Sequence, residues 1–155
     1  MYLETSIISY LVARPSRDIV TAAHQQITLE WWTLHRKEFD LFVSELVIRE
    51  AEAGDPDAAQ RRMEVLAGIR SLVLTEDARS LAHALIAGGA LPEKAAADAL
   101  HVAVATVQGA EYLLTWNCQH IANARVRVRI DRVCRERGLA PPVLCTPEEL
   151  MGDME

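Results

Sequence analysis

Asp98 has the most chemically informative setting in this sequence. It lies among alanines and branched aliphatic residues, in a segment from 92 to 108 whose periodicity predicts a helix. An ionised carboxylate in the middle of so apolar a helix is costly unless it is paired or bound to a metal ion. Two interpretations are therefore open from the residues alone: a structural aspartate bonded to a nearby hydroxyl or arginine, and a metal ligand.

Further polar side chains follow short apolar runs that are typical of strands. They are Glu4, Thr5 and Ser6 after the first run, Glu50 in the helix after the second, and Thr115 and Asn117 at the end of the fourth. In sheets of parallel strands, ligands bind beyond the carboxyl ends of the strands. The sequence therefore predicts a site at that edge.

The elements that position these residues alternate along the chain. Strand-like runs are expected at 2–3, 39–43, 71–74, 111–115 and 143–145, and helical periodicity at 7–12, 17–37, 46–53, 92–108 and 123–137. Ser16 is expected to cap the helix 17–37, and the run 71–74 to be a buried strand. This alternation predicts an α/β fold, a three-layer sandwich with a mainly parallel central sheet flanked by helices.

Length and charge limit the function classes. The 155 residues predict a single domain, 1–155, and the net charge of −6 excludes a general nucleic-acid coat protein. The three cysteines are an odd number without framework spacing, which predicts a reducing, cytoplasmic location. No signal peptide is apparent, and no apolar run reaches the ~18 residues of a membrane span, so no membrane partner is expected.

One dense basic segment lies near the C-terminus. Arg125, Arg129 and Arg132 share one face of the helix expected at 123–137. This face is either a solvated helix surface or a surface that contacts RNA phosphates.

Four other residues invite a functional interpretation, and for each we favour a structural one. Glu45 directly follows a strand, where we expect a solvated acid at a helix N-terminus. His101 shares a helix face with Asp98, but no second Asp-x-x-His motif is present for a dinuclear iron site, so a packed or hydrogen-bonded histidine is expected. Cys118 and His120 lack two further ligands at zinc spacing.

Four segments, in order along the chain, resemble the motifs of PIN-domain nucleases. They are Tyr2-Leu3-Glu4-Thr5-Ser6, residues 44–54 with Glu50 four positions before Gly54, residues 98–105, and Leu113-Leu114-Thr115-Trp116-Asn117 followed by His120-Ile121. The size of the chain and the lack of a second domain look most like the VapC-type toxins of bacterial toxin–antitoxin pairs.

This resemblance implies an endoribonuclease that requires Mg²⁺ or Mn²⁺ and cleaves RNA with metal-activated water. The implied ligands and catalytic residues are Glu4, Glu50, Asp98 and Asn117, and Thr5, Ser6 and Thr115 would orient these groups or bound waters. The resemblance also implies a homodimer and a small antitoxin protein as partner.

Two of the implied ligands differ from the residue usual in the family. Glu4 and Asn117 each stand where the family usually has Asp, so the site offers three negative charges instead of four. The alternative function is therefore a catalytically degenerate PIN domain that acts as a protein- or RNA-binding module.

Overall fold

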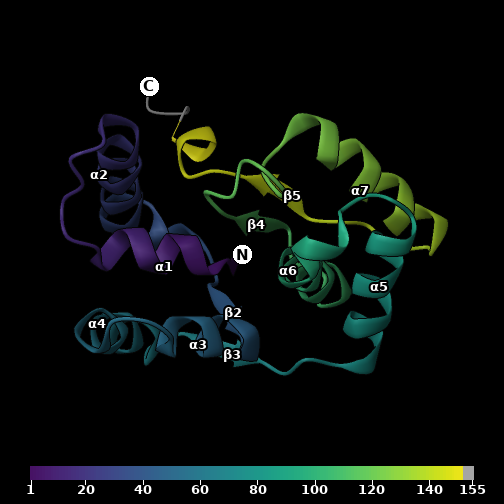
Figure 1. Cartoon of the computed structure of the whole chain (residues 1–155), viewed down its shortest axis with the longest axis horizontal. Helices are drawn as coiled ribbons and strands as arrows, with labels where there is room; N and C mark the ends of the chain where they lie inside the picture. The colour runs from purple at the N-terminus through teal and green to yellow at the C-terminus, as the bar shows by residue number, and fades with distance from the viewer. Residues whose placement is uncertain (152–155) are drawn as a thin grey trace.

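The computed structural model describes residues 1–151 and contains one five-stranded, entirely parallel sheet. The strands are β1 (Tyr2–Leu3), β2 (Phe42–Ser44), β3 (Arg70–Leu72), β4 (Tyr112–Leu114) and β5 (Val143–Cys145). They lie side by side in the order β3-β2-β1-β4-β5 (Figure 1). The chain order reverses direction at β1, so β1 and β4 form the switch point at which ligands bind in such sheets.

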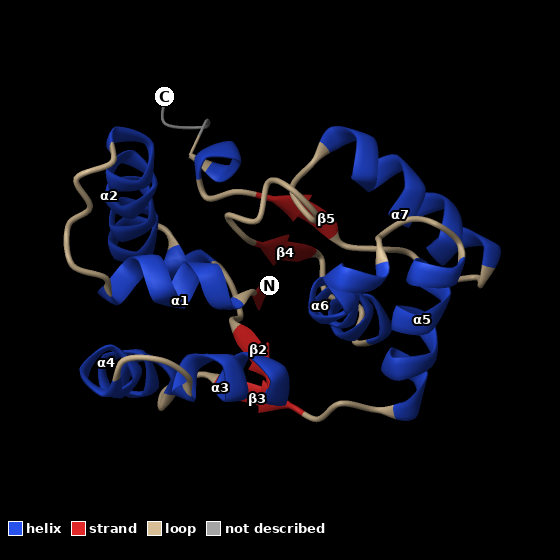
Figure 2. Ribbon diagram, in the orientation of Figure 1, coloured by secondary structure: helices blue, strands red, loops and turns tan. Residues whose placement is uncertain are grey.

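Helices cover both faces of the sheet. They are α1 (Thr5–Val12), α2 (Ile19–Leu34), α3 (Glu45–Glu52), α4 (Pro56–Leu66), α5 (Glu76–Ala87), α6 (Ala96–Val107) and α7 (Ala124–Glu136). Figure 2 shows α1, α2 and α4 on one side of the red strands and α5, α6 and α7 on the other. This arrangement confirms the predicted α/β sandwich with a parallel central sheet.

The core is centred on the two strands at the switch point. Leu3, Leu113 and Leu114 are fully buried, as is Ile7 in the first helix. Strands covered on both faces need apolar side chains on both faces, which explains why these short runs show no alternation of polar residues. No helix within residues 1–151 has the length and apolar character needed to cross a bilayer.

The structure corrects the predicted start of α2. Asp18, rather than Ser16, caps this helix, since its Oδ1 accepts a hydrogen bond from the Thr21 N–H at 2.8 Å. The Ser16 hydroxyl instead accepts from the Asp18 N–H at 3.1 Å. A carboxylate at the cap also interacts favourably with the positive end of the helix dipole, which favours the later start.

The prediction of a buried strand at 71–74 is also wrong. The strand is Arg70–Leu72, with Arg70 and Ser71 exposed, and Val73 beyond it is 62% exposed. The reason is topological, because β3 lies at the edge of the sheet and pairs only with β2.

The helix expected at 92–108 is divided, and this changes the setting of Asp98. A 3₁₀ turn, Glu93–Ala95, precedes α6, which begins at Ala96. Asp98 therefore lies in the first helical turn instead of mid-helix, and its side chain is 21% exposed. A carboxylate is favourable in a first turn, so the expected cost of burial in an apolar helix does not arise.

Candidate active site

Glu4 joins β1 to α1 and is held by hydroxyl groups. Its backbone N–H donates to the Leu114 carbonyl at 3.0 Å, which continues the β1–β4 pairing by one residue. Its side chain is buried, and its Oε2 accepts hydrogen bonds from the Thr115 hydroxyl at 2.7 Å and from the Ser6 hydroxyl. Two neutral donors thus fix one oxygen of this carboxylate.

The same hydroxyl groups organise the backbone after β4. Ser6 Oγ accepts from the Trp116 N–H at 2.8 Å, and Thr115 Oγ1 accepts from the Asn117 N–H at 2.9 Å. The orienting role expected of these two residues therefore has a structural basis: they connect the carboxylate of Glu4 to the β4–α7 loop.

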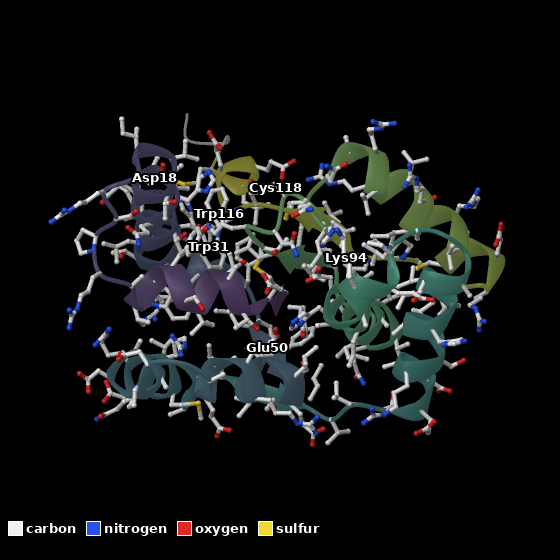
Figure 3. The ribbon with its side chains drawn as sticks, viewed as in Figure 1. Asp18, Trp31, Glu50, Lys94, Trp116 and Cys118 are labelled. Atoms are coloured by element: carbon white, nitrogen blue, oxygen red, sulfur yellow. The ribbon has the colours of Figure 1, made fainter. Side chains whose placement is uncertain are left out.

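Glu50 comes from α3 and reaches the same edge of the sheet. Figure 3 shows it on the side of α3 that faces the start of α1. Its Oε1 accepts from the Thr5 hydroxyl at 2.8 Å and lies 2.5 Å from His101 Nε2. Partial burial raises the pKa of Glu50, but the hydrogen bond and charge of His101 and the bond from Thr5 outweigh this effect, so the pKa is lowered overall. Glu50 is therefore ionised at neutral pH.

His101 belongs to a buried chain of hydrogen bonds beneath Glu50. Its Nδ1 lies 2.7 Å from the hydroxyl of Tyr2, which in turn lies 2.8 Å from Ser44 Oγ. Burial raises the pKa of Tyr2 well above its usual range, so the phenol stays protonated. A carboxylate can only accept, so we assign the imidazole proton to Nε2, and Nδ1 then accepts from Tyr2.

This chain confirms the interpretation of His101 as a packed, hydrogen-bonded histidine. The contributions of Tyr2 and Ser44 were missed by sequence reasoning. Tyr2 lies in the first strand of a parallel sheet, where an aromatic residue looks like an ordinary core residue. The one indication in the sequence of a buried polar contact at this place was Ser44, a polar side chain at the end of the neighbouring strand.

Asp98, in the first turn of α6, pairs with a histidine of the β4–α7 loop. Its Oδ2 lies 2.9 Å from His120 Nδ1, and the two side chains are 21% and 19% exposed. The partner is thus an imidazole, where the sequence suggested a hydroxyl or an arginine. The structural interpretation of His120 overlooked this contact with Asp98.

Asn117 holds the turn that brings His120 to Asp98. Its Oδ1 accepts from the His120 backbone N–H at 3.0 Å, and its carbonyl accepts from the N–H groups of Ile121 and Ala122. An amide oxygen has two lone pairs, so one remains for another partner. The expected fourth ligand therefore already has a structural role in the β4–α7 loop.

The three carboxylates have the chemistry of a hard-cation site. One oxygen of each accepts no hydrogen bond from residues 1–151, namely Glu4 Oε1, Glu50 Oε2 and Asp98 Oδ1. Carboxylate oxygens are the ligands that Mg²⁺ and Mn²⁺ prefer, so the donor types fit such an ion. Over the same residues, however, no group of three His, Cys, Asp or Glu side chains is placed to hold a metal.

Glu45 has a different role from the one expected. It occupies the first position of α3, and its Oε2 accepts from the Leu74 backbone N–H at 3.1 Å. It is partly buried instead of solvated, and it ties the segment after β3 to the start of α3. Glu50, by contrast, is bonded to Thr5 at the carboxyl edge of β1, and the preference for it over Glu45 as a metal ligand stays a prediction.

The three arginines of the predicted basic face lie exposed on α7. Arg132 Nη2 donates to the Gly88 carbonyl at 3.2 Å, and no carboxylate within residues 1–151 forms a salt bridge with Arg125, Arg129 or Arg132. Their neighbours Arg127 and Arg135 are paired with Glu149 and Asp131. Contact with RNA remains a prediction for this face.

The fold is similar to one found in a solved complex. The sequence matches no protein-family model, and no curated protein is significantly similar to it. A chain in the crystal structure of VapBC2 from Rickettsia felis bound to a DNA fragment from their promoter superposes with a TM-score of 0.54 and 17% identity, over 76% of this chain and 87% of that one. This likeness shows the fold, which agrees with the PIN-like sandwich implied by the four motifs.

Proposed function

We propose that this protein is a metal-dependent endoribonuclease that acts as the toxin of a toxin–antitoxin pair. One observation carries the proposal. Glu4, Glu50 and Asp98 come from three segments that are distant in the sequence, and each is held by its own hydrogen-bond partners at the carboxyl edge of the sheet. The likeness of the fold to VapBC2 supports the same class of protein.

Glu4, Glu50 and Asp98 are the residues that would hold Mg²⁺ or Mn²⁺. When bound, the ion would lower the pKa of a water molecule and stabilise negative charge on the phosphate. The chain's own residues fix the donors: Ser6 and Thr115 orient Glu4, while Thr5 and His101 orient Glu50. Asn117 keeps one lone pair for a ligand role while it holds the loop.

Hydrolysis of an RNA phosphodiester joins water to phosphorus and breaks a bond from phosphorus to a ribose oxygen, which then needs a proton. His120 is the group at this edge with a suitable setting. Its Nδ1 faces Asp98, and its Nε2 has no hydrogen-bond partner within residues 1–151. Asp98 fixes the orientation of the ring through Nδ1, so Nε2 is the ring nitrogen that remains to pass a proton to the ribose oxygen.

The expected partners follow from the same proposal. VapBC2 was solved as a complex on promoter DNA, and we propose that this chain likewise pairs with a small antitoxin protein. We also propose that it forms a homodimer and that RNA is its substrate, and that it works in the cytoplasm, as the odd number of cysteines suggests.

The second candidate function is a degenerate PIN domain that binds protein or RNA without cleaving it. Two observations favour it: the Asn117 amide oxygen is already bonded to the His120 N–H, and no group of three metal-binding side chains is assembled within residues 1–151. A module of this kind would retain the fold and the partners but not the chemistry.

Cleavage of single-stranded RNA in the presence of Mn²⁺ tests the proposed activity. We expect Glu50→Gln and Asp98→Asn each to lower the cleavage rate by roughly a hundredfold or more. Glu52→Gln is the matched control, because Glu52 is an exposed acid on the same helix, two residues after Glu50. Equal cleavage by wild type and Asp98→Asn would show that the proposed site is wrong.

Calorimetry with Mn²⁺ separates the two candidate functions. The enzyme should bind Mn²⁺, alone or with RNA present, and the Asp98→Asn variant should not. A wild-type protein that binds RNA but takes up no Mn²⁺ under either condition would instead be the binding module.

A further inference from the structure

A cavity lined by both apolar and charged side chains lies beside the first helix, away from the carboxylates. It has a volume of about 580 Å³, opens to the surface, and is lined by residues of α1, the segment that follows it, α2 and α4. In Figure 1 these elements lie together on the side of the sheet opposite α5, α6 and α7. The side chains that matter most in its lining are Tyr10, Arg14, Asp55, Arg61 and Arg62.

The charge of this cavity is positive in a protein whose net charge is −6. None of its three arginines forms a salt bridge with a carboxylate of residues 1–151. Its only acid is Asp55, whose Oδ2 is already used to cap α4 by accepting from the Ala58 N–H at 2.9 Å. Three guanidinium groups without acidic partners around one cavity favour an anionic ligand.

Two of the arginines are held in place through backbone carbonyls. Arg61 Nε donates to the Val12 carbonyl at 3.3 Å. Arg62 donates from Nε to the Ala51 carbonyl at 2.8 Å and from Nη2 to the Ala53 carbonyl at 2.6 Å. Because Arg61 is anchored only through Nε, both of its terminal nitrogens remain for a ligand. This fork matches the oxygens of a phosphate group.

Two helices, α1 and α3, contribute residues both to the carboxylate site and to this cavity or to the arginines that line it. Thr5, Ser9 and Val12 are spaced by four and three residues, so they lie on one face of α1. Thr5 binds Glu50, whereas Ser9 and Val12 line the cavity, roughly 6 and 10 Å further along the helix axis. On α3, the carbonyl that anchors Arg62 belongs to Ala51, the residue after Glu50.

Tyr10 makes a nucleic acid a better ligand than an acidic peptide. It lines the cavity, is only partly buried, and stacks with His24 and Trp116 at ring distances of 6.3 and 6.4 Å. An aromatic ring beside arginines is the combination that binds single-stranded nucleic acid, with the cations on the backbone and the ring near a base.

We propose that this cavity binds a phosphate group of the RNA strand, a short distance along the strand from the phosphodiester at the carboxylates. The proposal rests on the proposed function, since it assigns the substrate a second point of attachment. Arg14 and Arg61 contact the phosphate, and the cavity thereby sets the path of the strand along α1.

Equilibrium binding of a fluorescein-labelled ten-nucleotide RNA to the full chain tests this assignment. The titration is done in EDTA, so that cleavage plays no part, and at several salt concentrations. We expect Arg14→Gln and Arg61→Gln each to weaken binding about tenfold and to reduce the slope of log K against log salt by about 1. Arg14 is informative about binding rather than folding, because its side chain has no hydrogen-bond partner within residues 1–151.

Arg17→Gln is the matched control. Arg17 is an exposed arginine of the same segment, three residues from Arg14, and does not line the cavity. Unchanged affinity and salt slope in both cavity variants, or an equal loss in the control, would refute the assignment. Arg61→Lys, which keeps the charge but loses the fork, should be intermediate.

Competition experiments identify the kind of anion that the cavity binds. The RNA titration itself distinguishes failure of the cavity assignment from failure of the proposed function. Inorganic phosphate or a nucleoside monophosphate that competes as well as RNA, at equal phosphate concentration, would indicate a site for a free anion. Stronger competition by a poly-glutamate peptide would indicate a peptide site. Wild-type protein that binds no RNA would overturn both the cavity assignment and the proposed function. RNA binding that depends on neither arginine would overturn the cavity assignment alone.

Discussion

His101 Nε2 lies 2.5 Å from Glu50 Oε1, and this contact connects a buried helix on one face of the sheet to an acid presented from the other. The histidine is 1% exposed and the carboxylate 36%. The pair thus joins the interior of the protein to its candidate active site. Because Tyr2 binds the far side of the imidazole, the position of Glu50 depends on a residue in the centre of the sheet.

Removal of the Tyr2 hydroxyl tests this dependence. Tyr2→Phe keeps the ring but leaves the buried His101 Nδ1 without its donor, so we expect the free energy of unfolding to fall by about 1–3 kcal/mol. Urea denaturation measures the change. Tyr112→Phe is the matched control, because Tyr112 lies in a neighbouring strand and its hydroxyl makes no hydrogen bond within residues 1–151. Equal stability of the Tyr2 variant and wild type would show that the hydrogen-bond chain has no energetic role.

The lowered pKa of Glu50 predicts a dependence of stability on pH. A carboxylate whose pKa is lower in the folded state stabilises the fold above its unfolded-state pKa, near 4.5, and loses this contribution as the pH falls through the folded-state value. We therefore expect the stability difference between wild type and Glu50→Gln to shrink as the pH is lowered from 6 towards and below 4.5. Urea denaturation across this range measures it, with Glu52→Gln as control. A constant difference across the range would contradict the assignment of the hydrogen bonds that His101 and Thr5 donate to Glu50.

The contact between Trp116 and Thr28 makes a third prediction. The buried indole N–H donates to Thr28 Oγ1 at 2.7 Å, and this bond joins the β4–α7 loop to α2. Thr28→Val keeps the shape of the side chain but leaves the indole donor unpaired, which should cost about 1–3 kcal/mol of stability.

Thr33→Val is the control for this substitution. Thr28 and Thr33 both lie on α2 and both donate to the carbonyl four residues earlier, at 2.6 and 2.7 Å. Thr33 is exposed and accepts no indole, so a change within about 0.5 kcal/mol is expected for it. Thermal or urea denaturation compares the two variants, and a loss of equal size in both would mean that the indole bond contributes nothing.

Restoring the fourth acid should strengthen metal binding. In Asn117→Asp, a carboxylate can still accept from the His120 N–H, so the turn is kept, and the site gains a fourth negative charge. We expect calorimetry to show an affinity for Mn²⁺ at least tenfold higher than that of wild type. Asn123→Asp is the control, because it adds the same charge to the same loop, at the cap of α7. A similar gain in both variants would mean that general electrostatics, and not a ligand at 117, is responsible.

The sequence was sufficient to predict the α/β architecture and the edge of the sheet at which polar residues gather. This is because strands buried on both faces are continuously apolar, so Leu3, Leu113 and Leu114 mark the central strands without any knowledge of their neighbours. The side chains that follow such strands must lie at one edge when the strands are parallel. Glu4 and Thr115 could therefore be placed together from their positions in the chain.

Only the tertiary structure decided how each acid is held. His101 and His120 are the partners of Glu50 and Asp98, although the first pair is separated by 51 residues and the second by 22. A hydrogen bond between side chains of two helices, or of a helix and a loop, forms only when the distance between donor and acceptor is right to a few tenths of an ångström. The spacing of residues within one helix or strand does not specify that distance. The chain's periodicity therefore determined which residues face the edge of the sheet, while the packing of α3, α6 and the β4–α7 loop determined what each of them binds there.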